Sequence, residues 1–247
     1  MTALRVARAG RVVAGAQVMF GGRREGNASI DVGAGGHEGR RNVLVALGLQ
    51  AADAVFMEQV HGKAVGRVGR ADRGRRIAGV DALVTTEEDV ALVVLTADCV
   101  PILLLDPGRG AGAVHAGRRG VVAGIVPAAV AALTEATGSP PSRLTARTGP
   151  AIGGCCYEVP ATLAAGVAGV VPAARAETSW GTPSLDLPAA VAAALDACGV
   201  GAITRATECT RCIGARWFSH RAVAQGAPEG RNASVIVRST RTRGSPM

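Results

Sequence analysis

Two apolar segments that end in polar residues dominate the middle of this chain. The first, Ala91–Leu95, stops at a polar group that contains Cys99. The second, Ile102–Leu105, is followed by a turn at residues 106–108 and returns to end at His115. Short apolar runs bounded by Gly, Pro and Asp predict buried strands. Because these strands carry a thiol and an imidazole to their ends, the segment predicts a functional site as well as a fold.

The rest of the chain alternates between strand-like and helix-like patterns. Apolar residues at helical spacing predict helices over Glu38–Leu49, Val121–Thr137, Ala161–Val170 and Leu187–Ala197, with Asp186 as the cap of the last. Further strands are expected as two short ones over residues 4–20 around Gly10, a strand, turn and strand over Val55–Val65, then Val80–Thr85, Leu144–Thr148 and Ala233–Val237. Neither a repeat nor a linker is visible, which favours a single compact domain of mixed α and β elements.

Composition limits the classes of partner. The 247 residues are 48% hydrophobic but only 2% aromatic, so aliphatic side chains must fill the core. The net charge is +8, and an excess of arginine suggests an anionic partner. Nucleic acid is not expected, because the arginines are scattered and stacking aromatics are scarce. A small anionic substrate is the simpler expectation.

The chain lacks an apolar run of about twenty residues, so no membrane span is predicted. No secretory signal is visible at the N-terminus. Six cysteines in a chain of this length do not indicate a disulfide scaffold. We therefore expect a reduced, cytoplasmic setting.

Three side chains offer the ligands of a metal site. His61 lies upstream of the two central strands, and it would join Cys99 and His115. Two imidazoles and one thiolate suit zinc, whose catalytic sites have three protein ligands and an open fourth position. The same residues also fit a metal-free site in which Cys99 is a nucleophile and a histidine its base. In the simplest interpretation, Cys99 is a buried thiol and the histidines are unrelated.

Other cysteines form a second pattern. Cys209 and Cys212 have CxxC spacing, which is half of a zinc site or a redox couple. The adjacent Cys155 and Cys156 are able to complete a four-thiolate site, although neighbouring thiols without metal are the simpler interpretation. His220 is most simply a surface histidine, with a small chance of lining a pocket.

Short motifs in one order carry a resemblance to a known family. They are Gln59–Gly62, Asp81–Thr85, Thr96–Pro101, His115–Gly117, Gly149–Gly153, Cys156–Val159, Asp186–Leu187, Cys209–Cys212 and Phe218–Ser219. The chain resembles the multicopper polyphenol oxidase, or laccase-domain, family, now described as purine nucleoside phosphorylases. The resemblance implies an α+β fold, a layered α/β sandwich with mixed β-sheets, over residues 18–238. Strands in 1–17 and a disordered tail at 239–247 complete the expected organisation.

The resemblance also implies a function. His61, Cys99 and His115 would be zinc ligands for one ion. The implied reactions are phosphorolysis of adenosine, inosine, guanosine and S-methyl-5'-thioadenosine, and hydrolytic deamination of adenosine. Substrates are therefore a purine nucleoside and phosphate, and a monomer is favoured. Copper is less expected, since a multicopper oxidase needs many histidines and this chain has four.

The chain departs from the family pattern on loops. Arg118, followed by Arg119, stands where the family has Trp after His-Ala-Gly. Asp31 replaces a usual Asn in a shortened glycine-rich loop, and the Asn-Arg pair that opens the first long helix is Gly39-Arg40. These changes put the substrate range and the activity in question.

Arginines suit phosphate through paired hydrogen bonds. The candidate phosphate ligands are Arg23, Arg40, Arg118 and Arg119, each with a solvated surface role as the alternative. The alternative functions are a catalytically altered member that acts with cell-wall or division machinery, and a Cys-His hydrolase or oxidoreductase on the same site.

Overall fold

The computed structural model describes residues 11–13 and 15–238. The expected tail at 239–247, and the first of the two strands expected over residues 4–20, lie outside these residues. Within them, none of the helices combines the length and the apolar character that a transmembrane span requires.

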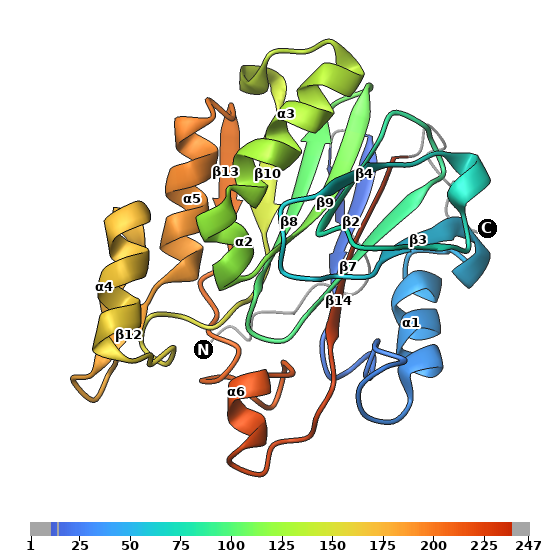
Figure 1. Cartoon of the computed structure of the whole chain (residues 1–247). Helices are drawn as coiled ribbons and strands as arrows, with labels where there is room; N and C mark the ends of the chain where they lie inside the picture. The colour runs from blue at the N-terminus through green and yellow to red at the C-terminus, as the bar shows by residue number, and fades with distance from the viewer. Residues whose placement is uncertain (1–10, 14, 239–247) are drawn as a thin grey trace, which may run out of the picture.

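Two six-stranded sheets form the centre of the fold (Figure 1). The first has the order β1 (Arg11–Val13), β2 (Ala16–Phe20), β14 (Asn232–Arg238), β7 (Ala91–Thr96), β3 (Ala54–Met57), β5 (Arg76–Ile77). The second has the order β13 (Ala202–Arg205), β10 (Thr145–Thr148), β8 (Val100–Asp106), β9 (Gly110–Ala116), β6 (Ala82–Thr85), β4 (Val65–Arg67). A separate hairpin joins β11 (Arg175–Glu177) and β12 (Pro183–Leu185).

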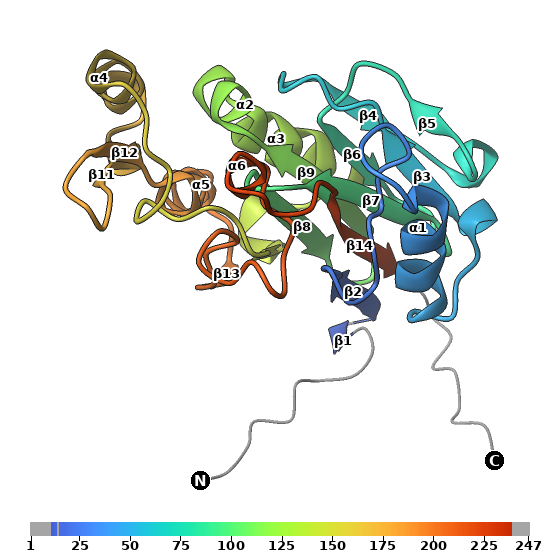
Figure 2. The same cartoon turned by 90° about the horizontal axis from the view of Figure 1, so that it is seen from below.

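Helices pack around the two sheets and the hairpin. They are α1 (Gly36–Val45), α2 (Arg118–Ala123), α3 (Ile125–Thr137), α4 (Ala161–Val170), α5 (Leu187–Ala197) and α6 (His220–Val223). Figure 2 shows α1 on the opposite side of the molecule from α3 and α5. Both sheets are mixed, because β7 pairs parallel with β3 but antiparallel with β14, and β10 pairs parallel with β13 but antiparallel with β8. The expected layered α+β sandwich is confirmed.

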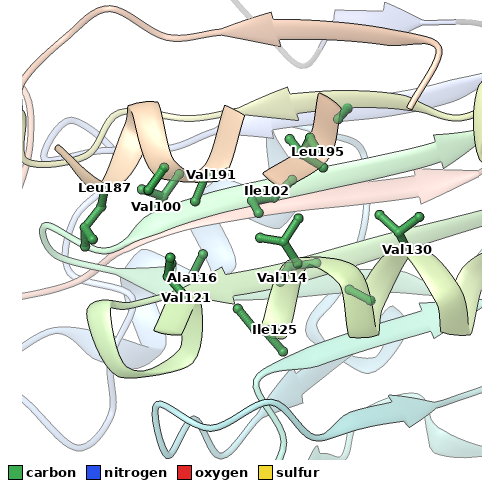
Figure 3. Packing of buried hydrophobic residues seen from close by; sticks show 14 of the residues in the cluster. Val100, Ile102, Val114, Ala116, Val121, Ile125, Val130, Leu187, Val191 and Leu195 are labelled. Atoms are coloured by element: carbon green, nitrogen blue, oxygen red, sulfur yellow. The ribbon is translucent and has the colours of Figure 1, made fainter. Parts of the chain in front are cut away.

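The central strand β8 explains why the core has layers. Successive side chains of a strand point to opposite faces. Ile102 and Leu104 therefore pack toward α3 and α5, whereas Leu103 and Leu105 pack between the two sheets. Figure 3 shows Ile102 and its neighbour Val114 meeting side chains of both helices. A strand buried on both faces reads as a continuous apolar run, as this one does.

Two expected elements differ in the structure. The helix expected over Val121–Thr137 is two helices, because Gly124 adopts a left-handed backbone (φ 89°) between α2 and α3. Pro127 then lies in the first turn of α3, where its missing N–H costs nothing. Residues 11–20 form a hairpin that turns at Gly15 (φ 84°), whereas a single strand is expected after Gly10 from the sequence. The cap that Asp186 gives to α5 is confirmed, since its carboxylate accepts from the N–H of Ala189 at 2.7 Å.

Candidate metal centre

The side chains of His61, Cys99 and His115 meet at one end of the sandwich. One ligand atom from each of the three lies within 4.8 Å of the others. The Sγ of Cys99 is 3.9 Å from Nε2 of His61, and the two imidazole rings lie edge to face with centroids 4.7 Å apart. His61 lies in the β3–β4 connection, Cys99 in the β7–β8 turn, and His115 near the end of β9. Sheet pairing thus brings three distant segments to one point.

A buried carboxylate organises this end of the sheet. Asp81, just before β6, is fully buried and accepts from Nδ1 of His115 at 2.8 Å. It also accepts from the backbone N–H groups of Val60, His61 and Gly62 at 3.2, 2.9 and 2.6 Å. The carboxylate therefore fixes the loop that carries one histidine and the ring of the other. Such outer contacts orient ligands and set which ring nitrogen remains for a metal, here Nε2 of His115.

Unusual backbone conformations aim two of the segments. His61 and Asp98 adopt positive φ values of 60° and 85°, which non-glycine residues rarely hold. Gly117 follows His115 closely, and a Cβ there would lie 2.7 Å from Cδ2 of His61 and 3.0 Å from Sγ of Cys99. A glycine follows His-Ala because the side chains of His61 and Cys99 occupy the space that a Cβ would need.

Cys99 and His115 shift each other's pKa. Burial opposes the thiolate of Cys99, but the charge of His115 and hydrogen bonds from both histidines lower the pKa of this thiol to about 6. Burial likewise opposes the imidazolium of His115, but the charge of Cys99 and the hydrogen bond to Asp81 raise its pKa to about 9. Without a metal the pair is therefore a thiolate and an imidazolium. A cation bound here would replace a proton on the His115 ring, and Cys99 would already be a thiolate.

The donor set fits a tetrahedral cation. Zinc accepts thiolate and imidazole together, and three protein ligands leave one position open. His61 is exposed, Cys99 half-buried and His115 buried, so the group faces a cavity on one side only. All three residues line that cavity, which has a volume of about 580 Å³.

Apolar and basic side chains share the walls of this cavity. Met57, Leu95, Ile152 and Leu187 supply apolar surface. Five arginines also line it, namely Arg76, Arg118, Arg119, Arg221 and Arg231. A space of this size that combines apolar walls with convergent polar groups suits a small anionic or polar ligand.

A family model described as multi-copper polyphenol oxidoreductase laccase matches residues 19–239. The chain belongs to this laccase family. Purine nucleoside phosphorylase SCO2081 of Streptomyces coelicolor is 53% identical to it over 177 residues, covering 71% of this chain and 72% of that protein. Purine nucleoside phosphorylase Rv2149c of Mycobacterium tuberculosis is 40% identical over 198 residues, covering 80% and 77%. The crystal structure of YlmD from Geobacillus stearothermophilus matches with a TM-score of 0.79 and 33% identity, covering 91% of this chain and 92% of that one.

The laccase-family fold separates the four arginines expected to bind phosphate. Arg118 and Arg119 open α2 and line the cavity. Arg40 instead donates to the carbonyl of Ala28 at 2.8 Å and lies over the ring of Phe56, 4.2 Å from its centroid. Arg23 donates to the carbonyl of Gly214, and neither it nor Arg40 lines the cavity.

Some residues of the site were not singled out from the sequence. Asp81 lies inside a matched motif, but only its pairing with His115 across β6 and β9 shows its role. Tyr157 lines the cavity under the guanidinium of Arg221, which is 5.1 Å from its ring centroid. His220, for which the sequence indicates only a small chance of lining a pocket, does line the cavity. Asp81 and Tyr157 each lie in a motif of the family resemblance, but neither motif indicates the residue's contacts.

Asp98 has a left-handed backbone in this turn (φ 85°), and its carboxylate binds other segments of the chain. Its carboxylate accepts from Oγ1 of Thr210 at 2.6 Å and from the backbone N–H of Arg221 at 2.7 Å. The backbone carbonyl of Asp98 accepts from the N–H of Ile152 at 2.9 Å. The turn that presents Cys99 is therefore fixed by two distant loops.

Proposed function

We propose that this chain is a zinc-dependent purine nucleoside phosphorylase that also deaminates adenosine. The proposed substrates are adenosine, inosine, guanosine and S-methyl-5'-thioadenosine. The observation that carries the proposal is the ligand group of His61, Cys99 and His115, which faces a cavity with arginine on its walls. Relatives that cover most of this chain and bear the name purine nucleoside phosphorylase support the reaction class.

The metal would be held by Nε2 of His115, the ring of His61 and the thiolate of Cys99. Zinc, when bound to three protein ligands, lowers the pKa of its water to about 7 and polarises oxygen atoms of a substrate. Asp81 keeps Nδ1 of His115 as the hydrogen-bond donor, so Nε2 is the nitrogen that would give up its proton to bind the metal. Deamination at purine C6 then needs a group that moves a proton, and His220 on the cavity wall is our candidate.

Phosphorolysis requires phosphate beside C1′ of the ribose. The phosphate oxygen forms the new bond to C1′ while the bond from C1′ to the purine nitrogen breaks, and the purine takes up a proton. Arg118 and Arg119 would bind the phosphate, with paired hydrogen bonds from a guanidinium. Arg221 adds positive charge on the same wall. Preorganised charge of this kind lowers the barrier because it does not have to reorient during the reaction.

The purine base needs a flat, largely apolar surface. Met57, Leu95 and Ile152 provide apolar wall, and Tyr157 offers an aromatic face. Burial raises the pKa of Tyr157, whereas the nearby charge of Arg118 opposes that rise. The phenol is therefore neutral at pH 7 and able to donate a hydrogen bond. In this proposal Tyr157 replaces the aromatic that the family has at position 118.

Copper is the competing metal, because the family description names it. Two imidazoles and a thiolate are also the equatorial ligands of mononuclear blue copper sites. Oxidation of phenols by a multicopper mechanism needs several histidine-rich centres, and among the four histidines only His61 and His115 meet here. Elemental analysis distinguishes the two metals, and a thiolate-bound Cu(II) centre would be coloured.

A direct assay tests the function. The purified protein is supplied with zinc and incubated with adenosine, with and without phosphate, and the products are separated by chromatography. Adenine that appears only with phosphate reports phosphorolysis, and inosine that appears without phosphate reports deamination. Cys99→Ala is the control, since it removes one ligand and little volume. Failure to form either product above the control would contradict the proposal.

A further inference from the structure

A second group of metal-ligand side chains lies outside the cavity. The thiols of Cys155, Cys156, Cys209 and Cys212 lie with all four sulfur atoms within 4.8 Å of one another. Cys155 and Cys156 belong to the loop after β10, and Cys209 and Cys212 to the loop after β13. The fold therefore brings together two pairs of cysteines that are far apart in the sequence.

The distances match a tetrahedral cation. The Sγ of Cys212 is 3.8 Å from that of Cys155 and 3.4 Å from that of Cys156. Four thiolates at about 2.3 Å from a zinc ion stand about 3.8 Å apart, which is the edge of a tetrahedron of that size. A disulfide requires about 2.05 Å, and all six cysteines are free thiols. A single disulfide would also join only two of the four thiols in this cluster.

A backbone donor points at one sulfur of this cluster. The N–H of Gly153 donates to Sγ of Cys209 at 3.3 Å. N–H groups that point at the first sulfur of a CxxC turn stabilise its negative charge. The CxxC spacing itself is the one that structural zinc sites use.

Direct hydrogen bonds also join the two loops, from the N–H of Thr210 to the carbonyl of Ala151 at 3.0 Å and from Arg211 to the carbonyl of Cys156 at 3.4 Å. Apart from the single bridge of Ala151 with Cys209, no strand pairing joins them within the described residues. Both loops nevertheless hold the turn that presents Cys99. Ile152 donates to the carbonyl of Asp98, and Thr210 donates to its carboxylate. An ion between the loops would therefore fix the backbone that positions a ligand of the cavity.

We propose that Cys155, Cys156, Cys209 and Cys212 bind a structural zinc ion that joins the two loops behind the cavity. The chain then holds two ions, one open to substrate and one enclosed by sulfur. A four-thiolate site leaves no position for water, so the second ion is structural. Because Cys212 is exposed, a chelator reaches it from the surface.

Zinc content tests the inference in a background that lacks the cavity ion. Cys99→Ser removes a ligand of the first group and leaves all four thiols of the second. We expect Cys99→Ser to retain about one zinc per chain, with four sulfur neighbours at about 2.3 Å by X-ray absorption. Adding Cys212→Ser should lower the zinc content at least tenfold. Adding Cys198→Ser is the matched control and should change nothing, because Cys198 ends α5 and lies outside the cluster.

Further measurements separate the other outcomes. Cys99→Ser without zinc would overturn the proposal, as would equal zinc in the Cys212→Ser and Cys198→Ser backgrounds. A thiol titration after chelation and denaturation should find five thiols in Cys99→Ser, because the chain has six cysteines and one is replaced. Three thiols would indicate a disulfide instead. Iron in place of zinc would overturn the metal assignment. If Cys212→Ser does not fold, as judged by circular dichroism, Cys155→Ser takes its place.

A melting experiment gives a readout that is independent of metal analysis. Chelation should lower the melting temperature of Cys99→Ser, since a structural ion contributes free energy to folding. It should leave Cys99→Ser with Cys212→Ser unchanged. None of these tests uses catalytic activity, so a failure of the proposed function would not be mistaken for a failure of this site.

Discussion

Asp81→Asn tests how the candidate metal centre is organised. One carboxylate oxygen accepts from the backbone N–H of His61 and from Nδ1 of His115, and the other accepts from the N–H groups of Val60 and Gly62. An asparagine keeps the size but has one accepting oxygen. In either orientation its NH₂ group faces two former donors.

The cost follows from these contacts. Two hydrogen bonds to a charged group are lost, at about 1.5–3 kcal/mol each. The free energy of unfolding should therefore fall by about 3–6 kcal/mol, out of the roughly 5–15 kcal/mol typical of a domain. Zinc affinity should fall about 10–100-fold, as for other outer contacts of metal ligands. If the NH₂ group faces His115, that ring accepts at Nδ1 and carries its proton on Nε2, which blocks the metal.

Urea denaturation and zinc competition with a coloured chelator measure the two effects. Asp106→Asn is the matched control, because Asp106 is also fully buried but lies at the opposite end of the β8–β9 strand pair from His115. The control should leave zinc affinity unchanged whatever it does to stability. An Asp81→Asn protein with the zinc affinity and unfolding free energy of the wild type would refute the role of the carboxylate.

Three further outcomes are expected. Gly117→Ala should lower zinc affinity about tenfold or more, because its Cβ would lie 3.0 Å from Sγ of Cys99. Gly166→Ala is the control and should leave zinc affinity unchanged, since the space around Gly166 is open. Equal zinc affinities of the two variants would contradict the steric reason. In the metal-free protein, alkylation of Cys99 should rise with pH through about 6, and not through about 8.5 as for an ordinary thiol, as followed by peptide mass spectrometry. In steady-state assays, Arg118→Ala should raise KM for phosphate about tenfold or more with little effect on KM for the nucleoside. Arg41→Ala, at an exposed position, is the control. Parallel changes in both KM values would count against a phosphate role for Arg118.

Local patterns in the sequence predicted the strands well, and the expected meeting of His61, Cys99 and His115 is confirmed, whereas their role as metal ligands stays a prediction. The apolar run Ile102–Leu105 and the polar stop at Cys99 are properties of neighbouring residues, so they are visible before folding. The break of the helix at Gly124 was also visible in principle, since glycine and the following Pro127 both disfavour a continuous helix.

Contacts between distant segments were not predictable in this way. The role of Asp81 depends on the register of β6 and β9, in which Ala82 pairs with Val114. The position of Arg40 depends on a carbonyl twelve residues away. The cluster around Cys209 depends on how two irregular loops fold, and such loops carry no periodic signal.

The connections that carry His61 and Cys99 share one property. Each leaves a strand of the first sheet, β3 or β7, and enters a strand of the second, β4 or β8. A cation bound by these two residues and by His115 on β9 would join the two sheets at this end of the sandwich. If the proposed zinc binds here, substitution of His61, Cys99 or His115 would weaken the contact between the sheets as well as remove the metal, so mutation alone would not separate a loss of activity from a loss of stability.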